Sequence, residues 1–517
     1  MRRDRREEIL AQLEAEKRAE KKKRSNGFCR FISIVYTIFA AAFVALLIKL
    51  NALPEKYLYA GIGILVVVSI FIVPVMFSKN GKKGRKISAT IMAFLLIAVF
   101  SVGSWYLADT LDFLDNITTV KQAQEEYYVI VKTDSLYEEG DLSGLDGQII
   151  GTWMSQDLSY SEAKADLQQK VNVEYSYEEK AGVAIDKLVA GDYSAVFLSA
   201  ATYQSMRSLK QDAEDVPAAD VTEETRILYT ISVPVEVEDQ TSSVDVTKES
   251  YNIYISGSDM TGDISVTNRT DVNMIATVNP KTHEVLLTSI PRDYYVTLPS
   301  KNAKDKLTHS SLYGIQESIG AVENALGIDV NYYLRVNYST IIKIVDAIDG
   351  IDVDSPVDFY TSGMKGMPEL NGHHFVKGMN HVDGKLALAF CRERHSFLSG
   401  DMQRNENQQA VMEAILKKAT GSTTILTKYT AILDAVKDNL STNMTTDEMA
   451  DIVKMQLKDM PDWKISKQAI KGTNGYEYCY SVGTNASTVD RIPEEEAKAV
   501  DRMVKAAKGD AASEDGQ

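Results

Sequence analysis

The stretch VNMIATVNPKTHEVLLTSIPRD, residues 272–293, decides the fold of the larger part of this chain. It contains two short apolar runs, Met274–Val278 and Val285–Ser289, which predict two strands. A similar run at Tyr251–Ile255 predicts a strand before them. The last of the three strands leads directly into an Arg-Asp pair, so charged side chains are expected where a strand of the sheet ends.

Helical patterns alternate with strand patterns after this stretch. We expect helices at Gly314–Leu326, Ser339–Ile348 and Arg404–Lys418, and a strand at Leu386–Cys391. In the first of these helices, apolar residues recur four, three and four positions apart, which is the spacing of a buried helix face. Strands that alternate with helices are typical of a layered α/β/α domain. We place this domain at residues 251–508, followed by a disordered tail at residues 509–517.

Three apolar stretches lie near the N-terminus. They are Phe31–Ile48, Tyr57–Phe77 and Ile87–Ala108, with lengths of 18, 21 and 22 residues, and none contains a charged side chain. A helix needs about 20 residues to cross the hydrocarbon core of a membrane. A cleaved signal peptide has a single, shorter apolar segment, so it does not explain three of them. We therefore predict three transmembrane helices within residues 31–108, after a basic tail at residues 1–30.

Charge is divided unevenly along the chain. Residues 1–108 carry 18 Lys and Arg and 7 Asp and Glu, a net charge of +11, which leaves −27 for the rest of a chain whose total is −16. Eleven of these basic residues lie in the first 30 positions, and five lie between the second and third apolar stretches. Basic segments stay in the cytoplasm, so we predict a multi-pass plasma-membrane protein with a cytoplasmic N-terminus and an extracytoplasmic body. The acidic body argues against nucleic acid as a partner.

A smaller domain is predicted between the membrane helices and the α/β/α domain. Residues 109–235 contain short β-rich runs and helical runs, which are typical of a small α/β accessory domain. Residues 236–250 are polar and lack periodicity, so we interpret them as a linker. The smaller domain has no catalytic constellation, and a spacer or docking role is favoured over ligand sensing.

Charged side chains gather at the ends of predicted strands in the larger domain. They form four groups: Asp259; Arg269 with Asp271; Arg292 with Asp293; and Arg392, Arg394, Asp401, Arg404 and Gln408. A single Arg–Asp pair at a strand end is more often a structural salt bridge than a catalytic group. Five arginines with two spaced aspartates in one domain favour a site for a phosphate-containing substrate, because the planar guanidinium suits phosphate oxygens.

The fourth group has a spacing that suits a polyanion. Arg392 and Arg394 are two positions apart on a predicted strand or at its end, so both side chains are expected on one face. Arg404 and Gln408 are four positions apart on a predicted helix and share one side of it. The neighbouring aspartates would repel an anionic substrate unless a divalent cation lay between them. Mg²⁺, or Mn²⁺ in its place, is the expected ion beside a pyrophosphate.

Other catalytic motifs are absent from the sequence. It has no G-x-S-x-G elbow, no Walker P-loop and no H-E-x-x-H, and its histidines lack the spacing of zinc ligands. Cys391 and Cys479 both lie in the body, so one disulfide is arithmetically possible. Two small buried side chains are the favoured interpretation.

Four segments of the larger domain resemble one protein family when they are taken together. GSDMTGDISVTNRTDVNMIATVNPKTHEVLLTSIPRDYYV (257–296), DKLTHSSLYG (305–314), VDAIDGIDVDSP (345–356) and GKLALAFCRERHSFLSGDMQRNENQQ (384–409) closely resemble the LytR-CpsA-Psr (LCP) family. Three spans followed by a small accessory domain are similar to its CpsA-type members. The resemblance covers about residues 250–420 firmly and extends loosely to about residue 505.

The resemblance implies an enzyme that transfers a glycopolymer from a polyprenyl-pyrophosphate carrier to peptidoglycan. The polymer would be capsule, teichoic acid or another secondary wall polymer. The family's metal-binding aspartates fall on Asp259 and Asp271. Its pyrophosphate-binding and other polar positions fall on Arg269, Arg292, Lys306 or His309, Arg392, Arg394, Asp401, Arg404 and Gln408. Asp271, Asp259 and Asp401 are equal candidates for the general base, and the oligomeric state is left open.

Other interpretations stay open beside this one. The same site acting with water as acceptor would make the protein a lipid-pyrophosphate phosphatase, which only product analysis distinguishes. A non-enzymatic envelope sensor would use residues 126–229, and a transcriptional attenuator is disfavoured because its DNA-binding residues would lie outside the cell. The apolar helix faces at 315–326 and 341–348 suit either a tunnel for the lipid tail or an ordinary core.

A double substitution of the two closely spaced arginines tests the predicted phosphate site. We expect Arg392→Ala combined with Arg394→Ala to abolish glycopolymer transfer, because two guanidinium groups that bind the pyrophosphate are lost. Transfer is measured by mass spectrometry of the products, and circular dichroism checks that the protein is folded. Retained transfer would contradict the assignment of these residues.

Overall fold

The computed structural model describes residues 2–78, 82–118, 124–153, 158–207, 219–234, 241–258, 269–362, 367–397, 400–421, 428, 431–432, 435 and 440–510. The chain divides into two compact units. The first consists of residues 1–116 with 445–460, and the second of residues 117–444 with 461–517. The boundaries of these units do not fall at residues 235 and 250, so the domain limits predicted there are not tested.

Long helices make up the first unit. They are α1 (Arg2–Leu50), α2 (Glu55–Phe77) and α3 (Lys83–Thr118), and the shorter α14 (Thr446–Asp459) belongs to the same unit. Each of the three long helices contains a segment long and apolar enough to cross a membrane, which confirms the three predicted spans by length and composition. Ile32 of α1, Ile72 of α2 and Ala93 of α3 share a buried cluster, and the Tyr36 and Ser69 hydroxyls lie 2.8 Å apart.

A five-stranded mixed sheet begins the second unit. Its order is β3-β2-β4-β1-β5, and its strands are β1 (Gln124–Lys132), β2 (Gln148–Trp153), β3 (Val173–Glu178), β4 (Val196–Ser199) and β5 (Thr225–Pro234). The accompanying helices are α4 (Leu158–Lys170), α5 (Ala181–Ala190), α6 (Ala200–Met206) and α7 (Val221–Glu224). Val129 and Ile130 of β1 are fully buried in two different clusters, so both faces of this strand are covered. These strands and helices agree with the mixed β-rich and helical runs of the sequence, and a separate accessory domain stays a prediction.

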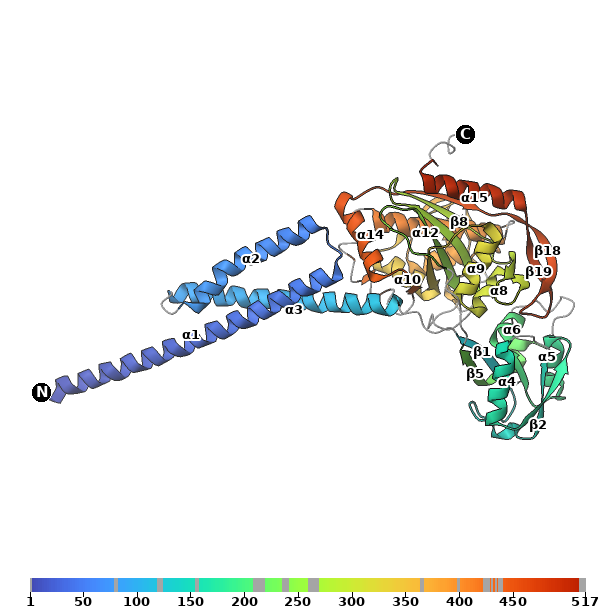
Figure 1. Ribbon diagram of the computed structural model, residues 1–517, viewed down its shortest axis with the longest axis horizontal. Coiled ribbons are helices and arrows are strands. Elements are labelled where there is room, and N and C mark those ends of the chain that lie inside the picture. Colours follow the sequence, from blue (N-terminus) through green and yellow to red (C-terminus); the bar gives the residue numbers. More distant parts are fainter. Residues whose placement is uncertain are drawn as a thin grey trace. The chain divides into compact units, whose positions relative to one another are not determined.

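A six-stranded sheet forms the centre of the larger α/β part (Figure 1). Its order is β16-β11-β6-β7-β8-β17, with strands β6 (Tyr251–Ser258), β7 (Thr270–Asn279), β8 (Glu284–Ser289), β11 (Tyr332–Asn337), β16 (Leu440–Thr442) and β17 (Lys464–Ala469). The pairs β6–β7 and β7–β8 are antiparallel, whereas β11 and β17 pair in parallel with β6 and β8. The three strands expected from the opening stretch and from Tyr251–Ile255 are therefore confirmed.

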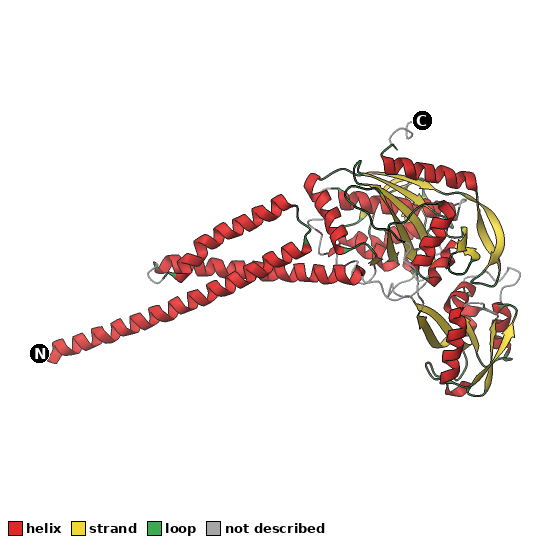
Figure 2. Ribbon diagram, viewed as in Figure 1, coloured by secondary structure: helices red, strands yellow, loops and turns green. Residues whose placement is uncertain are grey.

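The remaining elements surround this sheet, whose yellow strands lie among red helices in Figure 2. The helices are α8 (Leu307–Ser310), α9 (Ile315–Leu326), α10 (Tyr338–Ala347), α11 (Gly384–Arg392), α12 (Asp401–Thr420) and α15 (Pro493–Lys508). The small sheets consist of β9 (Tyr295–Leu298) with β10 (Ala303–Lys306), β12 (Ile351–Ser355) with β15 (Gly378–Val382), β13 (Phe359–Tyr360) with β14 (His374–Phe375), and β18 (Gly472–Cys479) with β19 (Thr484–Arg491).

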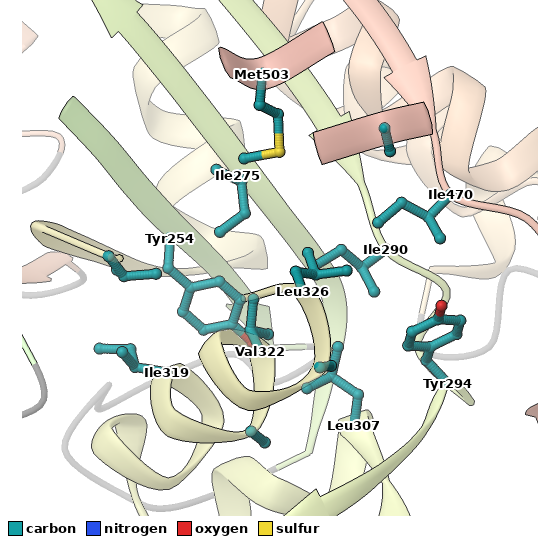
Figure 3. Close-up of a cluster of buried hydrophobic side chains, with 14 of the residues drawn as sticks. Tyr254, Ile275, Ile290, Tyr294, Leu307, Ile319, Val322, Leu326, Ile470 and Met503 are labelled. Carbon is teal, nitrogen blue, oxygen red and sulfur yellow. The ribbon is translucent and has the colours of Figure 1, made fainter. Parts of the chain in front are cut away.

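One face of the six-stranded sheet packs against α9 and α15 (Figure 3). Tyr254 and Ile275 of the sheet lie against Ile319 and Val322 of α9, and Met503 of α15 joins the same cluster. The apolar face of α9, for which the sequence left a lipid tunnel and a core as alternatives, is packed in this core.

The same cluster anchors the segments that carry charged groups. Tyr294 follows Arg292 by two positions, and Leu307 directly follows Lys306. The side chains of Tyr294 and Leu307 both lie in the cluster (Figure 3). The Tyr294 hydroxyl also donates a hydrogen bond to Glu496 of α15. Burial of these neighbours restricts where the arginine and lysine side chains can point.

Helices α10, α11 and α12 form a second buried cluster. Val345 of α10, Phe390 of α11 and Val411 of α12 belong to it. The side chain of Gln409 donates to the backbone oxygen of Leu287 at 3.2 Å, which ties α12 to β8. Residues 273–279 of β7 are all buried, so the sheet is covered on both faces, as the α/β/α prediction requires.

The predicted strand at Leu386–Cys391 is wrong. These residues lie in helix α11, whose N-cap Asp383 accepts a hydrogen bond from the backbone of Leu386. The run is short and apolar, and periodicity alone does not distinguish a buried strand from a buried helix segment of this length. The cap and the close contact of α11 with α10 decide the outcome.

Gly384, the first residue of α11, is the tightest point of this contact. A Cβ atom at this position would overlap the backbone oxygen of Ile342 in α10. We expect Gly384→Ala to lower the free energy of unfolding by about 1–3 kcal/mol, because the two helices must move apart. Denaturant unfolding of the purified protein measures this loss. Lys385→Ala, at the exposed neighbouring position, should change stability by less than about 0.5 kcal/mol, and an equal effect of both variants would contradict the packing argument.

Candidate active site

A chain of charged side chains lies near the start of β7, after the end of β8 and at the end of β10. Asp271 is near the start of β7, and its Oδ1 accepts from Arg292 Nη1 at 2.7 Å. Arg292 follows β8, and its Nε is 3.4 Å from Oδ2 of the adjacent Asp293. Lys306 ends β10, and its Nζ is 3.4 Å from the other carboxylate oxygen of Asp293. The antiparallel pairing of β7 with β8 brings residues 271 and 292 together.

The electrostatic surroundings keep Asp271 ionised. Burial alone raises the pKa of this carboxyl, but the positive charges of Arg292, Arg404 and Arg269 outweigh it and hold the pKa below its usual range. These three arginines come from three different segments of the chain. Three arginines that the sequence placed in separate groups thus act on one partly buried carboxylate.

Asp293 is held in the same way. Burial raises the pKa of its carboxyl, whereas Arg292, Lys306 and His309 lower it, and the net direction is downward. The sequence offered Lys306 and His309 as alternatives for one polar position. Both act on Asp293, so the structure places both beside the charged chain.

Helix α12 contributes Arg404 and Gln408. Both side chains are largely buried, and their spacing of four residues places them on one side of the helix, as predicted. The neighbouring Asn407 donates to the backbone oxygen of Phe390 in α11 at 3.1 Å. This hydrogen bond fixes the helix that presents Arg404 against the helix that presents Arg392.

Arg392 and Arg394 do not share a strand face, contrary to the prediction. Arg392 ends helix α11, and its guanidinium carbon lies 4.9 Å from the ring centre of Tyr338. Arg394 follows in a turn that depends on Glu393, a fully buried carboxylate. Glu393 accepts from the backbone nitrogens of Ser362 and Ser396 at 2.5 and 3.0 Å. The helix ends between the two arginines, so they do not share one regular element.

The structure also contains functional neighbours that the sequence did not suggest. Tyr338 supports Arg392, Glu393 shapes the turn before Arg394, and Asp305 binds the ring of His309 at 2.7 Å. Asp305 lies in β10 and His309 in α8, so the helical spacing rule does not relate them, and the sequence contains no signal for this pair. Tyr338 gives no signal in the sequence, since its role depends on a tertiary contact.

The side chains of two predicted site residues, Asp259 and Asp401, lie outside the described part of the structure. Asp259 lies outside the described residues, and only the backbone of Asp401, the first residue of α12, is described. Among the described residues, no three His, Cys, Asp or Glu side chains gather as metal ligands. Mg²⁺ nevertheless fits Asp271, since this ion is commonly held by one or two carboxylates together with substrate phosphates. The Oδ1 atom of Asp271 binds Arg292, and its second oxygen is the candidate donor.

Cysteine chemistry makes no contribution to this site. Cys391 and Cys479 are both free and buried, which agrees with the favoured interpretation of two small buried side chains. Burial raises the pKa of the Cys391 thiol to about 12, so it stays protonated at neutral pH.

Comparison with known proteins identifies the family. The LytR_cpsA_psr family matches residues 221–498, just over half of the chain. The chain belongs to the LytR_cpsA_psr family. The predicted resemblance is thereby confirmed, and the matched range contains every described charged group discussed above.

Individual members of the LytR_cpsA_psr family show how far the similarity extends. A Bacillus anthracis protein named polyisoprenyl-teichoic acid–peptidoglycan teichoic acid transferase TagU is 36% identical over 236 residues, which are 45% of this chain and 74% of that protein. The Enterococcus faecalis protein of the same name is 33% identical over 207 residues, 40% of this chain and 65% of its own. The crystal structure of B. subtilis TagU is 29% identical, covers 50% of this chain and 97% of its own, and has a TM-score of 0.38.

The position of Arg292 between two buried carboxylates gives a prediction about pH. We expect Arg292→Ala to lower the free energy of unfolding by about 3–5 kcal/mol at pH 7, because Asp271 and Asp293 lose a shared counter-charge. Both carboxyls have lowered pKa values in the folded protein, so the stabilisation is present above about pH 4 and is lost below it.

The difference between wild type and Arg292→Ala should therefore stay nearly constant from pH 7 to about pH 4 and shrink as the pH falls further, to about 2. Denaturant unfolding at pH 7, about 4 and about 2 measures it. Arg502→Ala, a change of the same size on α15, serves as the control and should show no such dependence. A penalty for Arg292→Ala that does not change with pH would contradict the ion-pair account.

Proposed function

We propose that this protein is an extracytoplasmic phosphotransferase that attaches a glycopolymer to peptidoglycan. The polymer is delivered on a polyprenyl-pyrophosphate carrier. The names of the relatives support this proposal, because they describe the transfer of teichoic acid to peptidoglycan. Capsule and other secondary wall polymers share the same linkage chemistry and belong to the same proposal.

The observation that carries the proposal is the gathering of four cationic side chains on two carboxylates. Arg292, Arg404 and Arg269 act on Asp271, and Lys306 acts on Asp293 together with Arg292. A site that only stabilised the fold would need one cation for each carboxylate. The surplus of positive charge, in a body with a strongly acidic sequence, suits a pyrophosphate.

The chain's own residues account for most of the proposed reaction. A sugar hydroxyl of peptidoglycan attacks the phosphorus that carries the glycopolymer, and a new phosphorus–oxygen bond forms. The bond from this phosphorus to the bridging oxygen breaks, and polyprenyl phosphate leaves. The arginines and Lys306 stabilise the negative charge that develops on the bridging and outer oxygens. The proton of the attacking hydroxyl passes to a carboxylate.

Asp271 is poorly suited to accept that proton. Its pKa is held low by three arginines, and an efficient general base has a pKa near the working pH. We therefore propose Asp271 as the residue that orients Arg292 and holds a divalent cation, and we propose Asp259 or Asp401 as the base. Bound Mg²⁺ would supply additional positive charge beside the pyrophosphate oxygens.

The membrane helices match a substrate that is itself a membrane lipid. We propose that the N-terminus lies in the cytoplasm, because the basic residues of the first 30 positions and of the second loop favour that side. The catalytic part then lies outside, where both the lipid carrier and the wall are within reach. The part of the chain that contains the five-stranded sheet is proposed to act as an accessory domain that spaces or docks the catalytic part.

A product analysis tests the proposed function. The purified full-length protein is incubated with a polyprenyl-pyrophosphate-linked oligosaccharide, soluble peptidoglycan fragments and Mg²⁺, with and without a chelator. We expect a sugar-phosphate adduct on the peptidoglycan and released polyprenyl phosphate, both dependent on the metal. Mass spectrometry identifies the products.

The other outcomes of this assay separate the alternatives. Polyprenyl phosphate with free sugar phosphate and no adduct would favour the phosphatase, with water as the acceptor. Recovery of the intact lipid in the presence of Mg²⁺ would contradict both enzymes. The variant with Arg392→Ala and Arg394→Ala is the matched negative control.

A further inference from the structure

A second buried polar network contacts the backbone of Lys306. Asp305 is fully buried, and its Oδ1 accepts from His309 Nδ1 and from the backbone nitrogen of Lys306, each at 2.7 Å. Its Oδ2 accepts from the backbone nitrogen of Ser481 at 2.7 Å. The Ser481 hydroxyl lies 2.9 Å from the same Nδ1 atom of His309. Four residues from two distant parts of the sequence thus form one closed network.

Ser481 reaches this network from the C-terminal hairpin of β18 and β19. It lies in the turn that joins the two strands and is 1% exposed. The preceding residue, Tyr480, donates from its backbone nitrogen to Lys304 at 3.1 Å. Further along the hairpin, Val489 donates from its backbone nitrogen to the backbone oxygen of Asp293 at 2.7 Å. The hairpin therefore holds the segment from Asp293 to His309 at both ends.

This segment carries the groups that act on Asp293. The Nζ atom of Lys306 lies 3.4 Å from the Asp293 carboxylate, and His309 acts on the same carboxylate electrostatically. Asp305 binds the backbone nitrogen of Lys306 and the ring of His309. A carboxylate that accepts from His309 Nδ1 fixes the orientation of the imidazole and directs its Nε2 edge away from Asp305. A shift of the segment would move Lys306 and the histidine together, away from the charged chain at Arg292.

We propose that Ser481 and Asp305 are positioning residues of the active site, which hold Lys306 and His309 in place for the pyrophosphate. This inference rests on the proposed function for the identity of the ligand. It assigns a role to the C-terminal hairpin, about 170 residues away in sequence from the lysine that it supports. Neither residue touches the substrate, so each acts through its neighbours.

A purely structural network makes a different prediction. If Ser481 and Asp305 only stabilised the fold, their loss would reduce the folded fraction and leave the affinity of each folded molecule unchanged. If they position Lys306, folded molecules bind the pyrophosphate more weakly. The affinity for the lipid therefore separates the two roles, whereas the melting temperature alone does not.

The test compares Ser481→Ala with wild type and with Ser487→Ala in the full-length protein. Ser487 lies on β19 and is exposed, so it provides a matched change on the same hairpin. The dissociation constant for polyprenyl pyrophosphate in mixed micelles is measured by titration, and the KM values for the lipid-linked oligosaccharide and for peptidoglycan are measured in the transfer assay. We expect Ser481→Ala to raise the dissociation constant and the lipid KM about tenfold, the usual loss for one charge-linked hydrogen bond, and to leave the peptidoglycan KM within about twofold.

Two further variants strengthen the comparison. Ser481→Thr keeps the hydroxyl and should bind the lipid within about threefold of wild type, and Ser487→Ala should match wild type. In a background with both Lys306→Ala and His309→Ala, Ser481→Ala should cause no further loss, because the two groups that it positions are absent. If Ser481→Ala does not fold, Asp305→Asn, which keeps the size of the side chain, is measured in the same way.

The proposal is overturned if folded Ser481→Ala binds polyprenyl pyrophosphate as tightly as wild type, or if its effect adds in full to that of the combined Lys306→Ala and His309→Ala variant. It is also overturned if wild type does not bind the lipid. Binding without transfer by wild type would contradict the proposed function alone, since the dissociation constants would still compare the variants.

Discussion

The guanidinium of Arg292 lies between two buried carboxylates, and the arrangement of the whole charged region depends on it. Its Nη1 binds Asp271 at 2.7 Å, and its Nε lies 3.4 Å from Asp293. Burying a carboxylate without a counter-charge costs several kcal/mol, and Arg292 offsets this cost for both Asp271, near the start of β7, and Asp293, which follows β8. Lys306 extends the same chain of alternating charges toward His309.

The fold supplies this arrangement through its hydrophobic core. Tyr294 and Leu307 are neighbours of the charged residues in sequence and are buried in the cluster between the sheet and helices α9 and α15 (Figure 3). The apolar side chains thus determine the backbone path, and the charged side chains project from a backbone that has little freedom to move. Catalytic groups that are preorganised in this way stabilise developing charge without a cost of rearrangement.

Support for the site also comes from segments that are remote in the sequence. The C-terminal hairpin contacts Asp305, the residue before Lys306, through Ser481. Helix α12 is hydrogen-bonded to α11 through Asn407. Each contact is a single hydrogen bond or a pair of them, made to a residue next to a charged group. Segments from the end of the chain therefore contact and support residues that follow the first strands of the six-stranded sheet.

The sequence by itself determined the three apolar spans, the strands β6, β7 and β8, the helices α9, α10 and α12, and the family. It did so because these features depend on local periodicity, on length and on residue types at short spacing. Helix α11 was predicted as a strand, because a six-residue apolar run fits both a strand and a helix. The contacts that decide for a helix are the N-cap at Asp383 and the packing of Gly384 against Ile342. Only the tertiary structure decided that Arg392 stacks on Tyr338 and that Ser481 meets His309, since no local rule relates residues that distant pairing brings together.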